Sequence, residues 1–297
     1  MKSNIKIVEK RGVESGKTLV ILAGVHGNEV CGVNAFDRLI PSLKIKSGKI
    51  IFVYANLEAI KQNKRFVEKN LNRSFLSMQP PEIEASLEGR TAKEIIPYLD
   101  EADAILDIHA SSTKDSIPFI ICDESLIEEA RLFNLKKLVC NIDRFEPGST
   151  DYYMNLQRKP AFCCECGYLG DVSAEETAQK AIIDFLTFYG CIEGINQFVV
   201  DPEVIKITGL YKNKFGSFRL PRYLKDFEKM NHETLIGFDG EEKIYLEKNK
   251  IIIFARDRDE VDSECFLFGE ISEENEERRN ILKSGNVQLD EGGMHVN

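Results

Sequence analysis

The feature that most constrains the fold is an alternation of short apolar runs with longer amphipathic stretches over the first two thirds of the chain. Six of the apolar runs have the length and composition of buried strands. They are Ile5–Glu9, Thr18–Ala23, Lys49–Ala55, Ala104–His109, Pro118–Cys122 and Ala161–Cys166. Strands that alternate with helices predict an α/β layer with a largely parallel or mixed sheet.

The stretches between these runs carry apolar residues at helical spacing. In the last of them Ala178, Ile182, Phe185 and Leu186 recur as one stripe, which predicts a buried helix face. The four predicted helices are Val30–Leu39, Glu82–Leu99, Ser125–Lys137 and Ala174–Tyr189. We therefore predict a mixed sheet flanked by helices.

The pattern changes beyond about Asn196. Short apolar runs then follow one another without helical stretches, and Asp239-Gly240 is a turn signal between two of them. The predicted strands are Phe198–Val200, Val204–Thr208, Phe215–Leu220, Thr234–Phe238, Lys243–Leu246, Ile251–Ala255 and Phe266–Gly269. We predict a first domain over residues 1–196 and a smaller β-rich domain over 197–297, which includes a charged tail from Glu273 to Arg279.

Composition and charge exclude several classes of function. The chain has 39 Lys and Arg against 49 Asp and Glu, a net charge of −10, so we expect no nucleic-acid partner, because phosphate contacts need a basic surface. No apolar run approaches the roughly 20 residues that span a bilayer, and no signal-peptide core follows the N-terminus, so no membrane partner is expected. The eight cysteines lie mostly inside strand-like or helix-like runs, which favours a reducing cytoplasm.

Two of the four histidines stand at the ends of predicted strands, where ligands bind in open α/β sheets. His26 and Glu29 are three residues apart where a strand gives way to a helix, and His109 ends a later strand. These three side chains could hold one cation, because two histidines, a carboxylate and a water form a catalytic zinc site. The same ligand types could also hold cobalt or manganese. Asp107, on the same face of its strand as His109, would orient a ligand.

A basic segment in this acidic chain, Lys61–Phe75, contains further candidates. The guanidinium of Arg73 could bind a carboxylate through two parallel hydrogen bonds, with Asn72 as a neighbouring amide donor. Arg65 could instead polarise a carbonyl in the transition state. Taken alone, the segment favours a solvated basic loop over a functional site.

Glu165 places a carboxylate inside an otherwise apolar predicted strand. A buried glutamate is usually paired, protonated or close to a metal, which marks it as a functional candidate. Cys164 and Cys166 would point away from Glu165 as small core residues, whereas Cys163 shares its face and would line a pocket.

Four segments in this order resemble the succinylglutamate desuccinylase/aspartoacylase family of zinc-dependent deacylases, which shares its catalytic fold with the zinc carboxypeptidases. The segments are Gly24-Val25-His26-Gly27-Asn28-Glu29, Asn70-Leu71-Asn72-Arg73, Asp107-Ile108-His109 and Cys164-Glu165-Cys166-Gly167. Asn70 stands where the family usually has Asp. The resemblance covers about Leu19 to Ile192, and the β-rich C-terminal part fits the family's second domain.

The resemblance implies a role for each matching residue. His26, Glu29 and His109 would hold one Zn²⁺ per chain. Glu165 would be the general base that takes a proton from the metal-bound water and returns it to the leaving amine. The two arginines would divide their tasks: Arg65 would polarise the scissile carbonyl, and Arg73, with Asn72, would bind a carboxylate of the substrate.

The sequence also departs from the family pattern. Asn155 stands where the aspartoacylase branch has a further substrate-binding arginine, and the C-terminal stretch that carries a tyrosine there has Arg256 and Arg258 here. The resemblance therefore does not predict N-acetylaspartate as the substrate. We expect a small N-acyl amino acid as the substrate, and association of the chain with copies of itself stays open.

Two other functions stay open from the sequence. One is a zinc carboxypeptidase that acts on a peptide or a cell-wall fragment, and the other is a non-catalytic binding protein on the same fold. Retention of all the family's catalytic residue types, Glu165 included, argues against the binding protein.

Overall fold

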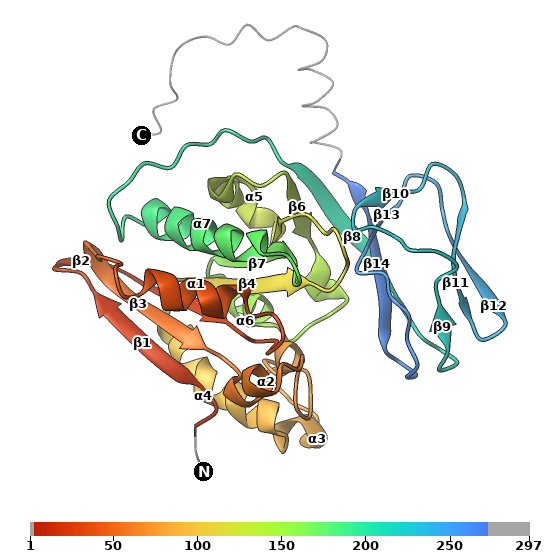
Figure 1. Ribbon diagram of the computed structural model, residues 1–297, viewed down its shortest axis with the longest axis horizontal. Helices are drawn as coiled ribbons and strands as arrows, with labels where there is room; N and C mark the ends of the chain where they lie inside the picture. Colours follow the sequence, from red (N-terminus) through yellow and green to blue (C-terminus); the bar gives the residue numbers. More distant parts are fainter. Residues whose placement is uncertain (1–2, 273–297) are drawn as a thin grey trace, which may run out of the picture.

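The structure, a computed structural model, describes residues 3–272 and is built around one large sheet with helices on both faces (Figure 1). In spatial order its strands are β1 (Lys6–Arg11), β3 (Ser47–Tyr54), β2 (Glu14–Ala23), β4 (Ala104–Ser111), β7 (Ala161–Tyr168), β5 (Phe119–Cys122), β6 (Lys137–Cys140), β8 (Glu203–Lys212), β14 (Glu264–Ile271), β13 (Ile251–Ile253) and β10 (Glu228–Lys229). A separate small sheet contains β12 (Glu242–Leu246), β11 (Thr234–Asp239) and β9 (Phe218–Arg219).

The middle of the large sheet consists of parallel strands, because β2 pairs in parallel with both β3 and β4, and β4 pairs in parallel with β7. Every residue of β4 is buried. Near-continuous apolar runs of this kind are typical of strands covered on both faces. Antiparallel pairs flank this centre, β1 with β3 and β5 with β7, so the predicted mixed α/β sheet is confirmed.

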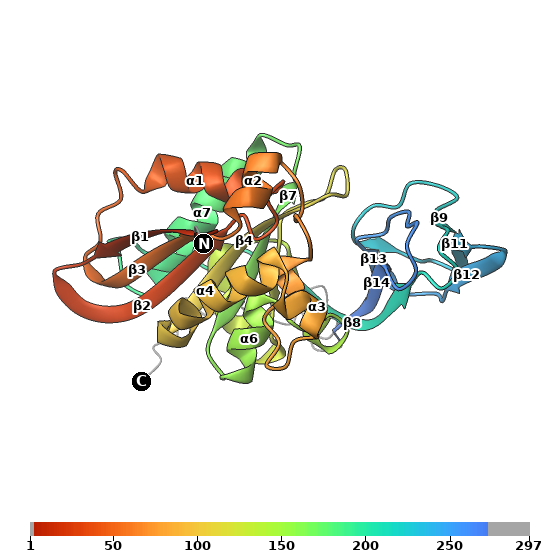
Figure 2. The same ribbon diagram turned by 90° about the horizontal axis from the view of Figure 1, so that it is seen from below.

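Helices cover the two faces of the sheet. Figure 2 shows α1 (Cys31–Leu39) and α7 (Ser173–Phe188) on one face, and α4 (Leu87–Glu101) and α6 (Thr150–Leu156) on the other. Successive side chains of β2 point to opposite faces of the sheet and so contribute to both cores. Leu19 and Ile21 pack in the core under α1 and α7, whereas Val20 and Leu22 pack in the core under α4. The shorter helices are α2 (Leu57–Gln62), α3 (Pro81–Glu84) and α5 (Ile127–Ala130).

Three predicted elements differ most from the structure. The predicted helix Glu82–Leu99 is split into α3 and α4, because the Ser86 hydroxyl accepts the Gly89 backbone N–H and caps a new helix. The predicted helix Ser125–Lys137 is a series of short turns that ends at Asn134, whose φ of 52° is left-handed, and β6 then begins at Lys137. Residues 198–200, predicted as a strand, form no regular element.

The C-terminal part is β-rich, as predicted, but four of its strands extend the large sheet. β8 pairs in parallel with β6, and β14, β13 and β10 follow by antiparallel pairing. The division between residues 196 and 197 stays a prediction. The charged segment Glu273 to Arg279 lies outside the described residues.

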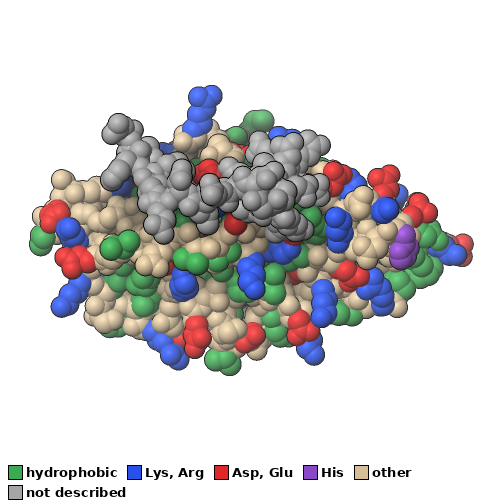
Figure 3. All heavy atoms as spheres, turned by 90° about the horizontal axis from the view of Figure 1, so that it is seen from above, with side chains coloured by type: hydrophobic (Ala, Val, Ile, Leu, Met, Phe, Trp, Pro, Cys, Tyr) green, Lys and Arg blue, Asp and Glu red, His purple; other side chains and the backbone are tan. Residues whose placement is uncertain are grey.

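Acidic and basic side chains are interspersed over the face of the molecule seen in Figure 3, with no broad patch of one sign where side chains are visible. Within residues 3–272, no helix has the length and apolar character that crossing a membrane requires.

Candidate functional site

A tight turn after β2 places the first two candidate ligands. Gly24 has a φ of +71°, which favours glycine, and the Gly27 backbone packs so closely on Ala59 and Ile60 of α2 that a Cβ there would overlap their main chain. The Glu29 N–H donates to the His26 carbonyl at 3.1 Å and closes the turn. Both side chains therefore emerge beyond the carboxyl end of β2, as the sequence predicted.

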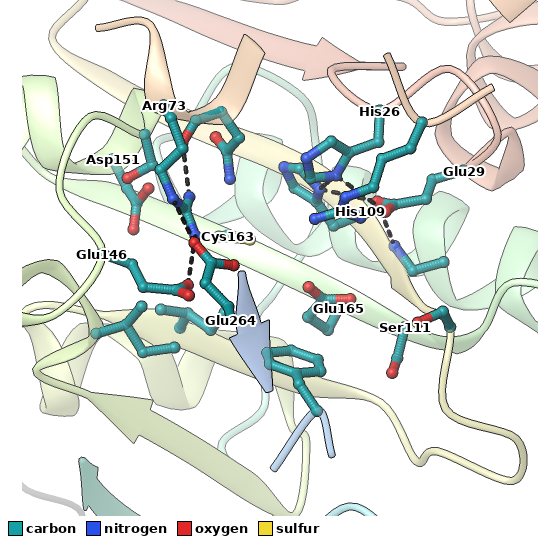
Figure 4. Close-up of a pocket in the computed structure, with 18 of the residues that line it drawn as sticks. His26, Glu29, Arg73, His109, Ser111, Glu146, Asp151, Cys163, Glu165 and Glu264 are labelled. Carbon is teal, nitrogen blue, oxygen red and sulfur yellow. Dashed lines mark hydrogen bonds and ion pairs between the residues drawn. The ribbon is translucent and has the colours of Figure 1, made fainter. Parts of the chain in front are cut away.

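His26, Glu29 and His109 converge in the structure and are all buried (Figure 4). Nδ1 of His26 lies 2.9 Å from Glu29 Oε1, and Nδ1 of His109 lies 2.9 Å from Glu29 Oε2. The two Nδ1 atoms are 3.2 Å apart. The structure thus gathers one ligand atom from each residue within 4.8 Å of the others, which is the arrangement of a three-ligand metal site.

The outward nitrogens of both imidazoles face acceptors. His26 Nε2 lies 3.0 Å from Asn70 Oδ1, and His109 Nε2 lies 3.2 Å from Asp107 Oδ2, at ion-pair distance though not aligned as a hydrogen bond. Thr150 Oγ1 donates to the same Asp107 oxygen at 2.5 Å. An acceptor at the outer nitrogen holds the proton there and leaves the Nδ1 lone pair free for a cation. The donor set therefore fits a metal ion, and Asp107 lies where the sequence predicted.

The electrostatics of the three residues without a metal favour deprotonated ligands at two of them. Burial, with a further contribution from Arg65, lowers the pKa of His26 to about 4, so this imidazole is neutral at pH 7. Burial alone would raise the pKa of Glu29, but the two imidazoles outweigh it and hold that pKa well below its ordinary value. His109 is the exception: despite burial, Asp107 and Glu29 raise its pKa well above the ordinary value.

Glu165 lies on β7 directly beside His109, its register partner on β4. Its side chain is buried in the pocket, and its Oε2 has no hydrogen-bond partner among the described residues. Burial, reinforced by the negative charge of Glu29, raises the pKa of Glu165 to about 8. A carboxyl group with this pKa can both hold and release a proton near neutral pH.

The predicted residues of the basic segment, Arg65, Asn72 and Arg73, also line this pocket. Arg65 Nη1 donates to Glu29 Oε1 at 2.7 Å. Asn72 contributes an amide oxygen that has no partner among residues 3–272. Arg73 has its guanidinium occupied: it pairs with Glu264 at 3.1 Å and with Glu146. In Figure 4 the charged cluster of Arg73, Glu146 and Glu264 lies across the pocket from His26 and Glu29. Glu165 lies between this cluster and the candidate metal ligands.

Four charged residues of the pocket were not assigned a role from the sequence: Glu146, Asp151, Arg256 and Glu264. Burial and Glu264 raise the pKa of Glu146 to about 7, while Arg73 outweighs burial and lowers that of Glu264 to about 2. Asp151 lies in the first turn of α6 and Glu146 in the loop before that helix, whereas Glu264 begins β14. Nothing local in the sequence marks these carboxylates, because the sheet order brings them together.

The cysteines on β7 are placed as predicted. Cys164 and Cys166 lie in the core under α7, and Cys163 lines the pocket on the face of Glu165. His232 is exposed in a loop, and His295 lies outside the described residues.

Comparison with known proteins gives the family. The family model of the succinylglutamate desuccinylase/aspartoacylase catalytic domain matches residues 15–186, more than half of the chain. The N-alpha-acetyl-L-2,4-diaminobutyric acid deacetylase of Halomonas elongata is 27% identical over 214 residues, which are 66% of this chain and 61% of that protein. The succinylglutamate desuccinylase of Pseudomonas fluorescens is 39% identical over 67 residues, which are 21% of this chain and 20% of that protein. These matches span less than two thirds of either relative.

Solved structures share the fold over most of the chain. The succinylglutamate desuccinylase of Vibrio cholerae superposes with a TM-score of 0.72 at 16% identity, covering 89% of this chain and 84% of that one. The ectoine utilization protein EutE (DoeB) of Ruegeria pomeroyi gives a TM-score of 0.67 at 18% identity, covering 90% and 88%. The mixed sheet, the four motifs and the match over residues 15–186 lead to one conclusion: the chain belongs to the succinylglutamate desuccinylase/aspartoacylase family.

Proposed function

We propose that this protein is a zinc-dependent hydrolase that cleaves the amide bond of a small N-acyl amino acid. One observation carries the proposal: three convergent ligand atoms from His26, Glu29 and His109 lie beside the buried carboxyl group of Glu165 in a single pocket. Family membership supports it, as do the deacetylase of Halomonas elongata and the desuccinylase of Pseudomonas fluorescens.

His26, Glu29 and His109 would hold one zinc ion per chain. Two imidazoles and a carboxylate are a donor set that zinc favours in catalytic sites, and acceptors at both outer nitrogens support this assignment. His109, whose pKa is raised in the metal-free site, would release its proton when the metal binds. When bound, zinc supplies Lewis-acid chemistry, since it polarises a carbonyl and lowers the pKa of water.

Glu165 would transfer the proton. As the carbonyl carbon is attacked by water, the carboxylate accepts the water's proton, and it delivers that proton to the amine nitrogen as the C–N bond breaks. Without a metal, burial raises the pKa of Glu165 to about 8, and a bound cation would lower it from there, which suits a group that must first accept and then release a proton. Its burial keeps competing solvent away from the proton.

Arg65 and Asn72 would bind the reacting amide. Arg65 brings a fixed positive charge against Glu29 and into the pocket, where it can stabilise the negative charge that develops on the carbonyl oxygen. The unpartnered amide oxygen of Asn72 is suited to accept a substrate N–H. Arg73, from the same segment, would contact the substrate from the opposite side of the pocket, where Glu146 and Glu264 already neutralise its guanidinium.

We also propose that the protein works in the cytoplasm. All eight cysteines lie in the described part of the chain, where they are free and buried, which suits a reducing compartment.

The test is amine release from a panel of amides by zinc-loaded protein and by protein treated with a chelator. The panel contains N-acetyl-L-2,4-diaminobutyrate, N-succinyl-L-glutamate, N-acetyl-L-alanine and a set of short peptides. Hydrolysis of an N-acyl amino acid that needs zinc would support the proposal. Cleavage of the peptides alone would replace it with the carboxypeptidase function, and silence of the whole panel with zinc bound would favour a binding protein.

A further inference from the structure

Three arginines line the pocket, and they differ in what neutralises them. Arg65 is paired with Glu29, and Arg73 is paired with two carboxylates. Arg256 has no carboxylate of residues 3–272 within ion-pair distance. Its Nη1 makes one long hydrogen bond, 3.3 Å to the Ser112 hydroxyl, and its Nε has no partner within the described part of the chain. Among the described residues, Arg256 is thus the pocket arginine that is not paired with a carboxylate.

The charge of Arg256 is only partly compensated, by Glu264 and Glu146, neither of which lies within ion-pair distance of it. Burial, with repulsion from Arg258 and Arg65, lowers the pKa of Arg256 to about 10, so the guanidinium is still cationic at neutral pH. A partly buried guanidinium offers a planar pair of donors that matches a carboxylate, and the reduced access of water strengthens the pairing.

The backbone holds Arg256 at the pocket by contacts between the two parts of the chain. Phe254, two residues earlier, lines the same pocket in a left-handed conformation with φ 59°, and its N–H donates to Asp226 Oδ1 at 2.7 Å. The other oxygen of Asp226 accepts from Ser111 Oγ at 3.0 Å, at the end of β4 beside Ser112. An unfavourable backbone conformation fixed by such contacts is typical of functional sites.

Arg73 is less able to accept a substrate anion by itself. Its Nε and Nη2 donate to Glu264, its Nη2 also donates to Glu146, and its Nη1 donates to the Asn72 carbonyl at 2.7 Å. A substrate carboxylate could bind there only by displacing one of these acceptors, which would leave a poorly solvated carboxylate without its partner.

We propose that Arg256, contributed by the β-rich C-terminal part, binds a carboxylate of the substrate and sets the preference of the site for anionic N-acyl amino acids. This inference rests on the proposed hydrolase function. The carboxylate has two chemical sources, the α-carboxylate of the amino acid or a carboxylate on the acyl group. Either one presents the same pair of oxygens to the guanidinium.

The experiment compares three substrates in wild type, Arg256→Gln and the matched control Arg258→Gln. N-acetyl-L-2,4-diaminobutyrate carries only an α-carboxylate, its carboxamide carries none, and N-succinyl-L-2,4-diaminobutyramide carries only an acyl carboxylate. We expect Arg256→Gln to lower kcat/KM about 10- to 150-fold for the carboxylate substrate that wild type prefers, which is the usual cost of losing a hydrogen bond to a charged group. The kcat/KM for the carboxamide should stay unchanged. Arg258→Gln removes the same charge, but Arg258 does not line this pocket, so the variant should keep the wild-type preference for the carboxylate substrate.

Each result decides the inference. Loss of preference for the first or the third substrate supports it and identifies the α-carboxylate or the acyl carboxylate as the source. A preserved preference, or an equal loss on the carboxamide, overturns it. If wild type hydrolyses none of the three, calorimetric titration of the same compounds replaces turnover. Carboxylate-dependent binding that Arg256→Gln abolishes would then uphold the inference while the hydrolase proposal fails, and binding that is absent or independent of Arg256 would overturn both.

Discussion

Replacing Glu165 by Gln should stabilise the metal-free protein, and the gain should grow as the pH rises. The folded pKa of about 8 lies above the ordinary value of 4.5, because burial and Glu29 disfavour the charged carboxylate. Between these values the folded state binds more protons than the unfolded state, so Glu165 costs the wild type stability as pH rises through the window. Glutamine has nearly the same shape and no charge, so it escapes this cost.

The magnitude follows from the same two values. Their separation, at about 1.4 kcal/mol per pH unit, sets a ceiling of about 5 kcal/mol, reached above pH 8. About 1.4 kcal/mol of the cost is present at pH 5.5, because the unfolded carboxyl has begun to ionise there. The free energy of unfolding of Glu165→Gln, relative to wild type, should therefore rise by about 3 kcal/mol between pH 5.5 and 8.

Urea unfolding of both proteins in the presence of a chelator, at the two pH values, measures this difference. The pH 5.5 pair is the internal control for effects of the substitution other than charge. Added zinc should shrink the difference, because a nearby cation favours the charged carboxylate. A difference that is equal at both pH values, or a glutamine variant that is less stable at pH 8, would refute the argument that burial holds a proton on Glu165.

Three further predictions concern the ligands and their support. Asp107→Asn should weaken zinc binding about 10- to 100-fold, because the carboxylate beside His109 Nε2 orients that ligand. Competition with a chelator of known affinity measures the zinc affinity, and an unchanged affinity would show that Asp107 does not support the site. Gly27→Ala should lower Tm by several degrees more than Gly190→Ala, because its Cβ would overlap the backbone of α2, whereas the Cβ at Gly190 meets open space and adds only the strain of a φ of +69°. An equal fall in both variants would contradict this. Zinc at about 100 times its Kd should raise the free energy of unfolding of wild type by about 2.7 kcal/mol but leave His26→Ala unchanged; an equal rise in both would place the metal elsewhere.

The central fold could be predicted because its signals are local. The strands that became β2, β4 and β7 are near-continuous apolar runs, and their burial on both faces follows from the helices between them. The region 125–137 could not be predicted in the same way. Its apolar spacing suits a helix, but Asn134 takes a left-handed conformation and ends a series of turns before β6. The short strands β9 and β10, of two residues each, likewise depend on partners distant in the chain.

In the candidate site, too, the residues marked by local sequence could be predicted, and those positioned by distant partners could not. His26 and His109 could be paired from the sequence, because parallel strands end at one edge of the sheet and each histidine follows such an end. The ion pairs of Arg73 with Glu146 and Glu264 could not be predicted, because these carboxylates lie 73 and 191 residues away in the sequence. The isolated position of Arg256 depends in the same way on β13 and β14, which bring the C-terminal part to the pocket.

The measurement that tests the central claim most directly is zinc content and turnover of Glu165→Gln beside wild type. If Glu165 transfers the proton at a site held by His26, Glu29 and His109, the variant should bind one zinc ion per chain as wild type does. Its kcat for the best N-acyl amino acid should fall by at least about 100-fold, the usual loss for a general base. A zinc-loaded variant with wild-type kcat would contradict the account, because the proton would then be carried by another group.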